Sequence, residues 1–245
     1  MNDVEYDELT DSVLLAVEEA IENMDLDLGG RKGAPKFPMP NNYQFLLKYA
    51  VRSGDNEILD YVNTSLTKMA YGGIYDQIGG GFSRYSVDAK WHVPHFEKML
   101  YDNGQLVSLY AEAYQATKNE NYKAIILQAA KTLSSRYNPK VGLIRSWDHH
   151  KDVWDFPVII DNLMNLEMLF RATTWTGDSS YYKIAYSHAF LTMKNHYRPD
   201  ISCFHVVDYN PNTGAIQKKV THQGASDASA WARGQAWGLY GYTMI

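Results

Sequence analysis

A repeated pair of helical patterns restricts the fold of this chain more than any other feature. Each copy is an apolar helical pattern, a short turn containing Gly, Asp or Asn, and a second amphipathic pattern. The turns begin at Ser53, Thr117 and Thr176, so the repeat is about 60 residues long. Two helices per repeat predict helical hairpins stacked side by side. The three copies read LKYAVRSGDNEILDYV, LYAEAYQATKNENYKAIIL and LFRATTWTGDSSYYKIAY.

The same patterns extend over most of the chain. Asp55, Asn119 and Asp178 follow the three turns and are good N-caps for the second helix of each hairpin. Strand-like alternation is weak and confined to long loops, for example at residues 204–209. The expected helices cover residues 8–24, 41–53, 56–71, 95–117, 120–137, 158–176, 179–197 and 228–245.

This order predicts an all-α protein with an α/α toroid, in which outer helices surround inner helices. About four helical hairpins can be recognised, and we expect residues 1–245 to form a single domain. An open α-solenoid has the same periodicity and is the alternative. In both arrangements the long loops gather at the N-terminal ends of the inner helices, where we expect the functional site.

The composition argues against several classes of protein. The 245 residues include 23 Lys and Arg and 28 Asp and Glu, and residues 1–30 have no basic side chain, which argues against a nucleic-acid partner. The single cysteine, Cys203, excludes a disulfide scaffold and a cysteine zinc cluster. No apolar run has the length of a membrane span, and the start MNDVEYDELTDS lacks the pattern of a signal peptide. We therefore expect a cytoplasmic protein with no membrane partner.

Two aspartates are the candidate catalytic residues. Asp161 opens an expected inner helix in FPVIIDNLMNLEMLF, where apolar neighbours would desolvate its carboxyl and raise its pKa. A raised pKa suits a general acid at neutral pH. Asp102 lies in HFEKMLYDNGQL, in the preceding inner helix. Two carboxylates that face one funnel are typical of glycosidases, and a first-turn acid that only stabilises its helix is the alternative for each.

Polar and aromatic residues collect around the start of the last expected helix. Arg233 and Trp237 are four residues apart and share one helix face, so Arg233 can pair with a carboxylate while Trp237 stacks on a sugar ring. His222 and Gln223 precede them, and His205 lies in another loop over the same rim. These histidines could donate hydrogen bonds to a substrate. The alternative is a tryptophan stripe in the core beside a solvated arginine.

A metal site is not expected. His92 and His95 have a spacing compatible with metal binding, but no third ligand stands out in the sequence. We therefore expect neither a metal nor an organic cofactor. A sugar epimerase on the same type of barrel would use paired histidines, for which His95 and His222 are candidates.

Two runs in the first half are distinctive: GAPKFP (33–38) and MAYGGIYDQIGGGFSRYSVDAKWHVPHFEKMLYDNGQL (69–106). Through these runs and the flanking helices, residues 30–115 resemble the helical domain of the spermatogenesis-associated protein 20 family. The resemblance implies a helical toroid, without a settled chemistry that could be carried over.

Four runs stand out between residues 120 and 245: LQAAKTLSSRYNPKVGLIRSWDH (127–149), FPVIIDNLMNLE (156–167), HVVDYNP (205–211) and THQGASDASAWARGQAWGLYGYTM (221–244). Through these runs, residues 120–245 resemble glycoside hydrolase family 88, the unsaturated β-glucuronyl hydrolases. The chain thus looks like a hybrid of two related toroids, with one half at 1–118 and the other at 119–245. The resemblance implies a full barrel of six hairpins, so about four hairpins imply an incomplete six-hairpin barrel.

The resemblance to the hydrolases implies roles for both aspartates. The residue matching Asp161 is the acid/base, which protonates C4 of the C4=C5 double bond of an unsaturated uronate while water adds at C5. The hemiketal that results then opens and releases the rest of the sugar. The family's second aspartate sits in an HDxGF-like motif, and YDNGQ at 101–105 occupies that place. Asp102 is therefore the matching candidate, although the motif's His and Phe are replaced.

The same resemblance implies that His205, Gln223, Arg233 and Trp237 contact the uronate. The expected function is hydrolysis of unsaturated glucuronyl oligosaccharides without a cofactor. The alternative is a non-catalytic or engineered chimeric helical scaffold that keeps relic site residues. Four hairpins would leave apolar helix faces without partners, so a homo-oligomer joined through open barrel edges is a further expectation.

Overall fold

The computed structural model describes residues 3–96, 98, 100–148 and 150–245. The chain divides into two compact units. Unit 1 contains residues 1–78, 82–98 and 112–119, and unit 2 contains residues 79–81, 99–111 and 120–245. Within the described residues, no helix is both long enough and apolar enough to cross a membrane.

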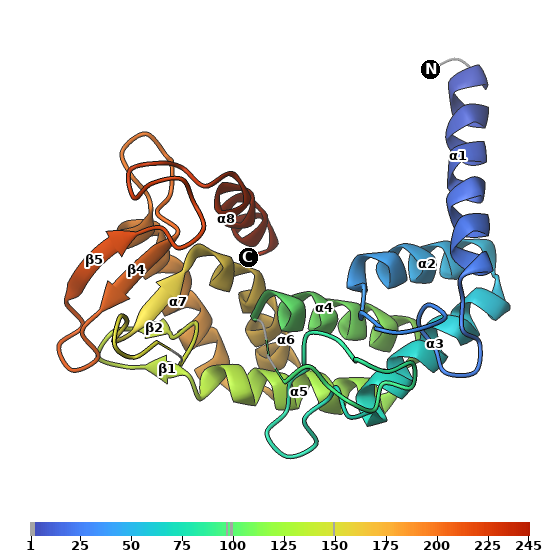
Figure 1. Cartoon of the computed structure of the whole chain (residues 1–245), viewed down its shortest axis with the longest axis horizontal. Coiled ribbons are helices and arrows are strands. Elements are labelled where there is room, and N and C mark those ends of the chain that lie inside the picture. Colours follow the sequence, from blue (N-terminus) through green and yellow to red (C-terminus); the bar gives the residue numbers. More distant parts are fainter. Residues whose placement is uncertain (1–2, 97, 99, 149) are drawn as a thin grey trace. The chain divides into compact units, whose positions relative to one another are not determined.

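Most elements are helices, and short strands lie in the long connections between them (Figure 1). The α-helices are α1 (Asp3–Glu22), α2 (Pro40–Ser53), α3 (Asn56–Tyr71), α4 (Leu100–Thr117), α5 (Glu120–Ser134), α6 (Leu166–Thr176), α7 (Ser179–His196) and α8 (Ala232–Met244). A 3-10 helix, η1 (Ile160–Asn165), precedes α6 directly. The strands are β1 (Tyr137–Asn138), β2 (Leu143–Ile144), β3 (Pro157–Ile159), β4 (Val206–Tyr209) and β5 (Ile216–Val220).

In unit 1, α2 and α3 form the first predicted hairpin. Gly54 ends α2 with a positive φ of 76°, a conformation that glycine adopts without strain. Asp55 caps α3 by accepting a hydrogen bond from the backbone N–H of Ile58 at 3.1 Å. Leu46 of α2 and Val62 of α3 are buried, so the apolar faces of both helices contribute to the core of this unit.

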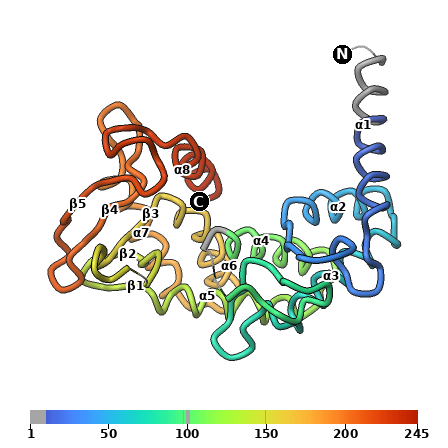
Figure 2. Tube along the Cα trace, viewed as in Figure 1, coloured from blue at the N-terminus to red at the C-terminus, as the bar shows by residue number. Residues whose placement is uncertain are grey.

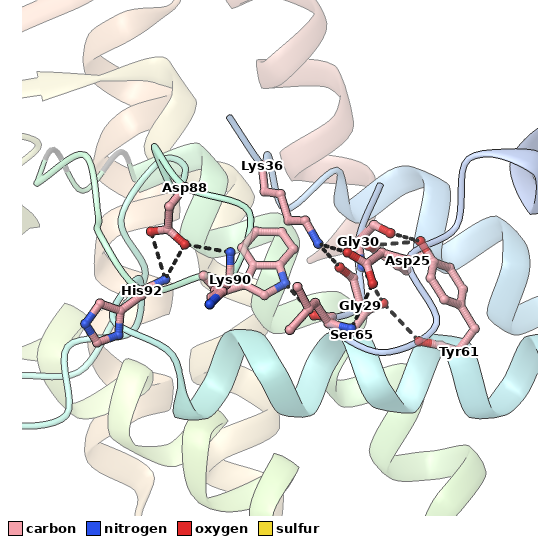
Figure 3. Close-up of polar contacts among 12 residues, drawn as sticks. Asp25, Gly29, Gly30, Lys36, Tyr61, Ser65, Asp88, Lys90 and His92 are labelled. Carbon is pink, nitrogen blue, oxygen red and sulfur yellow. Dashed lines mark hydrogen bonds and ion pairs between the residues drawn. The ribbon is translucent and has the colours of Figure 1, made fainter. Parts of the chain in front are cut away.

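The buried side chain of Lys36 contacts several loop residues of unit 1 (Figure 3). The Lys36 side chain is 1 % exposed, and its Nζ lies 2.8 Å from Oδ2 of Asp25 and 2.6 Å from the carbonyl oxygen of Gly29. The indole of Trp91 lies beneath the same ammonium group and donates a hydrogen bond to the carbonyl of Leu28 at 2.9 Å. The Lys36 charge is thus matched by oxygen acceptors, as burial of a charge requires.

In unit 2, α6 and α7 form a second predicted hairpin. Gly177 ends α6 with a φ of 75°, and Asp178 caps α7 by accepting a hydrogen bond from the N–H of Ser180 at 2.8 Å. Helix α5 packs against α6. The N-caps expected at Asp55 and Asp178 are confirmed, and α5 begins at Glu120, directly after Asn119.

Two small antiparallel sheets lie in the long loops of unit 2. Strands β1 and β2 form a two-stranded ladder, and β3, β4 and β5 form a sheet in that order (Figure 2). Val158 pairs with Val207, and Val206 pairs with Val220. The strand signal expected near residues 204–209 is confirmed by β4, whose four residues are all buried.

The helix predicted at 158–176 is wrong in its first part, where the chain forms β3 and then η1. The N–H of Ile159 donates to the Ser146 hydroxyl at 2.9 Å, and the N–H of Ile160 donates to the carbonyl of His205 at 3.1 Å. These partners from distant segments compete with the helical hydrogen bonds.

Two other helices begin later than predicted. Helix α4 begins at Leu100 rather than at residue 95, because His95 donates its backbone N–H to the carbonyl of Tyr85 at 2.9 Å. Helix α8 begins at Ala232 rather than at residue 228, because Ser229 is held in a turn by a 2.9 Å backbone bond to Ser226.

Candidate active site

Asp161 is a buried carboxyl at the start of η1. Its residue is 4 % exposed, and the strand before it, β3, belongs to the three-stranded sheet. Burial raises the pKa of the Asp161 carboxyl to about 6, and the positive charge of Arg233 offsets part of this rise. The predicted desolvation of Asp161 is therefore confirmed, with the correction that the carboxyl lies on a 3-10 helix.

His205 faces this carboxyl and has a defined protonation state. Its Nε2 lies 4.0 Å from Oδ2 of Asp161. Its Nδ1 accepts hydrogen bonds from the backbone N–H groups of His222, at 3.1 Å, and Gln223, at 3.3 Å. An accepting Nδ1 carries no proton, so the proton of the neutral ring is on Nε2 and is directed toward Asp161. Burial, with the nearby His222 and Arg233, lowers the pKa of His205 to about 4, so the ring is neutral at pH 7.

Arg233 and Gln223 meet beside this pair. The guanidinium of Arg233 contacts Oε1 of Gln223 and lies 4.6 Å from the ring centroid of Trp231. The Trp231 ring in turn lies 4.2 Å from the ring of His205. Trp237 is half-buried, one turn further along α8. Four of the residues expected at the site therefore lie together: Asp161, His205, Gln223 and Arg233. The Trp231 ring contacts two of them, His205 and Arg233.

The ring of His222 points toward two further indoles. Its centroid lies 5.9 Å from that of Trp147 and 6.4 Å from that of Trp154. Trp147 and Trp154 are absent from the residues selected on sequence, although they lie in a long loop of the kind expected to build the site. Trp231 belongs to the polar and aromatic residues expected around the start of the last helix.

Close packing of α8 against η1 brings Arg233 near Asp161. A Cβ atom added at Gly241 would collide with Leu163, and one added at Gly234 would lie 3.1 Å from Ile160. Only glycine allows the helix axis to come this near without displacing η1. The glycines of α8 thus set the distance at which the Arg233 charge acts on the Asp161 carboxyl.

Asp102 lies in the first turn of α4 and is half-buried. Its helix approaches the far end of η1, since a Cβ atom at Gly104 would collide with the side-chain oxygen of Asn165. This contact places Asp102 near the element that carries Asp161, within unit 2. A catalytic partnership of Asp102 with Asp161 stays a prediction.

Among the described residues, no group of three or more His, Cys, Asp or Glu side chains is arranged to hold a metal ion. The side chains at this site include a carboxyl with a raised pKa at Asp161, a neutral imidazole at His205, the amide of Gln223 and the positive charge of Arg233.

The sequence model of Glycosyl Hydrolase Family 88 matches residues 42–245. The chain belongs to this family. The family match begins well before residue 120, so it crosses the boundary between the two predicted halves. Relatives of both kinds are found, which fits the hybrid interpretation, and the division at residues 118 and 119 stays a prediction.

The family 88 chain is 57% identical over 130 residues to an unsaturated glucuronyl hydrolase of Formosa agariphila, covering 53% of this chain and 32% of that protein. It is also 42% identical over 123 residues to human spermatogenesis-associated protein 20, covering 47% of this chain and 16% of that protein. This family 88 chain therefore spans about a third or less of the length of these two relatives.

A crystal structure of an unsaturated glucuronyl hydrolase specific for heparin is similar over 99% of this family 88 chain, with a TM-score of 0.74 and 32% sequence identity. The chain covers 62% of that structure. The predicted fold class, an α/α toroid of helical hairpins, is confirmed, with the small sheets of unit 2 as an addition.

Proposed function

We propose that this family 88 chain hydrolyses unsaturated glucuronyl oligosaccharides by hydrating the C4=C5 double bond of the terminal uronate. One observation carries the proposal. The Asp161 carboxyl is buried, has a pKa raised to about 6, and faces the neutral side chain of His205. A carboxyl with this pKa is partly protonated near neutral pH and can donate its proton.

The proposed reaction begins with proton transfer from Asp161 to C4. Water adds its oxygen at C5 and returns a proton to the Asp161 carboxylate, so the carboxyl is regenerated. C5 then carries a hydroxyl and the ring oxygen, which is a hemiketal. Opening of the hemiketal breaks the bond between C5 and the ring oxygen, forms a ketone at C5 and leaves a hydroxyl on C1, which is then a hemiacetal. Collapse of this hemiacetal gives an aldehyde at C1 and releases the rest of the sugar as an alcohol, without attack on the anomeric carbon.

The neighbouring side chains have complementary tasks. The Arg233 guanidinium is exposed and suited to pair with the uronate carboxylate, with Gln223 as its direct neighbour. His205, whose Nε2 proton is directed toward Asp161 from 4.0 Å, is placed to donate to a substrate oxygen. Trp237 supplies an apolar surface for a sugar ring, and His222 borders the site. Asp102 is proposed as the second carboxylate.

The test follows the ultraviolet absorbance of the double bond in an unsaturated uronide disaccharide. The parent chain is expected to remove this absorbance, and Asp161→Asn to be slower by about 10²–10⁴-fold, the usual contribution of a positioned acid. Asp161→Asn has nearly the same shape, so a difference between the two folded proteins reports the proton. A folded parent that leaves the absorbance unchanged would refute the proposal.

That negative outcome would support a second candidate, a helical scaffold with relic site residues. The observation behind it is coverage: the chain covers 62% of the heparin-specific structure, and about half of the chain also resembles spermatogenesis-associated protein 20. Intact circular dichroism with no turnover would be the expected pattern.

Self-association through apolar helix faces is a separate part of the proposal. Tyr182, Tyr186 and Phe190 lie on one face of α7, are 48%, 56% and 57% exposed, and stack on one another along the helix. Exposed apolar patches of this kind are unusual on a monomer. Sedimentation should show a dimer or larger species, and Tyr186→Lys should shift it to a monomer. A monomeric parent would contradict this.

A further inference from the structure

The backbone on both sides of Asp161 is held by a second segment of the chain. Ser146 Oγ accepts a hydrogen bond from the N–H of Ile159 at 2.9 Å and lies 3.1 Å from Oδ1 of Asn162, to which it donates. The Nδ2 of Asn162 donates to the carbonyl of Ile144 at 2.9 Å. All four residues are buried. The Ser146 hydroxyl and the Asn162 amide thus connect the residues around Asp161 to the segment 144–146.

The segment that provides these contacts is itself fixed. The N–H of Ile144 donates to Nδ1 of the buried His188 at 3.0 Å, and the N–H of Ser146 donates to the carbonyl of Pro157 at 2.9 Å. Both backbone polar groups of Ile144 are therefore engaged, one by His188 and one by Asn162. Because segment 144–146 is held in place, its hydrogen bonds can fix the position of η1.

The residues on both sides of Asp161 in the chain form hydrogen bonds with other segments. Ile159 is bound by Ser146, Ile160 by the carbonyl of His205, and Asn162 by Ile144 and Ser146. A short 3-10 helix has poor hydrogen-bond geometry and little stability of its own. Contacts from outside the helix must therefore determine where its first turn points the Asp161 side chain.

We propose that Asn162 is a positioning residue, which acts through Ser146 and Ile144 to hold the Asp161 carboxyl in its buried orientation toward His205. The value of this orientation for catalysis rests on the function proposed above, whereas the orientation itself is a property of the fold. Loss of the Asn162 amide would leave the Ile144 carbonyl and the Ser146 hydroxyl without these partners. Water would then enter to satisfy them, directly beside Asp161.

The test measures the protonation of Asp161 itself and needs no turnover. Carboxyl carbons of aspartate are followed by NMR across pH in protein with ¹³C-labelled aspartate, and the signal missing from Asp161→Asn identifies Asp161. The parent signal is expected to titrate near pH 6. In Asn162→Ala, entry of water should lower this midpoint by about one pH unit, toward the ordinary value for aspartate.

Asn195→Ala is the matched control. Asn195 also lies in unit 2 and donates a side-chain hydrogen bond, to the hydroxyl of Tyr209 at 3.1 Å, away from Asp161. Its removal should leave the Asp161 midpoint within about 0.2 units of the parent, well below the one-unit shift expected from exposure to water. A folded Asn162→Ala protein whose Asp161 titrates as in the parent would overturn the proposal.

Ser146→Ala provides a second variant in case Asn162→Ala does not fold. It removes the hydroxyl that joins Ile159 to Asn162, so the same downward shift is expected, and an unchanged midpoint would again overturn the proposal. If the parent hydrolyses the uronide, Asn162→Ala should lower kcat by about 10-fold with KM unchanged, as misplacement of the acid predicts. A parent without turnover would refute the proposed function and leave the titration as the deciding result for Asn162.

Discussion

Nε2 of His205 lies 4.0 Å from Oδ2 of Asp161, and the same imidazole accepts the backbone N–H groups of His222 and Gln223 through Nδ1. His205 therefore lies against both the buried Asp161 carboxyl and the loop that carries Gln223. Because Nδ1 is occupied as an acceptor, only the Nε2 proton can face the carboxyl.

Replacing His205 should loosen this loop. In His205→Ala the N–H groups of His222 and Gln223 lose their acceptor, and we expect the free energy of unfolding to fall by about 1–3 kcal/mol. His222→Ala is the control, because it removes an exposed ring and keeps the backbone N–H, so its effect should stay within about 0.5 kcal/mol. Urea denaturation followed by tryptophan fluorescence measures both. Equal losses in the two variants would show that the Nδ1 contacts do not stabilise the loop.

The proposed hydrolysis should weaken as Asp161 loses its proton. Its pKa is raised to about 6, so the acid form dominates below pH 6 and falls about tenfold for each pH unit above it. The rate constant kcat measured between pH 5 and 8 should therefore decline on the alkaline side. A rate constant that rises between pH 6 and 8 would contradict the role of Asp161 as acid.

The ionised carboxyl of Asp161 should also lower the free energy of unfolding at neutral pH. A carboxyl whose pKa is higher in the folded state binds more protons there than in the unfolded chain, so stability is lost as pH rises from about 4 to about 6. Above pH 6, Asp161→Asn removes this cost and should raise the free energy of unfolding by about 1–3 kcal/mol. Thermal denaturation at pH 7.5 and at pH 4 should show a gain at the first pH and little change at the second. A variant less stable than the parent at pH 7.5 would argue against desolvation of Asp161.

Two buried histidines should make unit 2 sensitive to acid. Burial, together with His196, lowers the pKa of His188 to about 3, and burial is the main reason why the pKa of His196 falls to about 4. The unfolded chain binds protons at these histidines below pH 6.5 while the folded chain does not, so stability is full above pH 6.5 and falls as the pH drops toward 4. Two protons correspond to a slope of up to about 2.7 kcal/mol per pH unit.

A double variant with the same hydrogen bonds tests this prediction. His188 accepts from Ile144 through Nδ1, and His196 Nε2 lies 3.0 Å from the carbonyl of Val158. His188→Asn keeps an acceptor near the first position, and His196→Gln keeps a donor near the second. Urea denaturation from pH 7 to pH 4.5 should show a shallower loss of stability in His188→Asn/His196→Gln than in the parent. Identical slopes would assign acid sensitivity to other groups.

The Lys36 contacts should dominate the stability of unit 1. Lys36→Met would leave the partly exposed Asp25 carboxylate and the Gly29 carbonyl without their cation, and loss of a donor to such acceptors costs about 1–3 kcal/mol. Lys48→Met is the control, since its 3.5 Å pair with Glu112 leaves the lysine side chain 62% exposed. That change should cost less than about 1 kcal/mol. Comparable losses in the two variants would contradict the structural role assigned to Lys36.

Local sequence was sufficient wherever the physical cause is local. The α2–α3 hairpin, the turns at Gly54 and Gly177, and the caps at Asp55 and Asp178 depend on residues within a few positions of one another, and all are found in the structure. The apolar neighbours of Asp161 likewise predicted a desolvated carboxyl with a raised pKa, which is confirmed.

Long-range hydrogen bonds determine the backbone conformation around Asp161, which the periodic pattern of the sequence did not predict. Asp161 lies on a 3-10 helix because Ser146, Ile144 and the carbonyl of His205 take the polar groups around it. Those partners are 13 or more residues away along the chain from the groups they bind, beyond the reach of any periodic pattern. The hairpins and their caps follow from local sequence, because they depend on residues that are near neighbours along the chain. The contacts of His205 with Asp161 and with Trp231 depend on the folded chain, because the packing of β4, η1 and α8 brings these distant residues together.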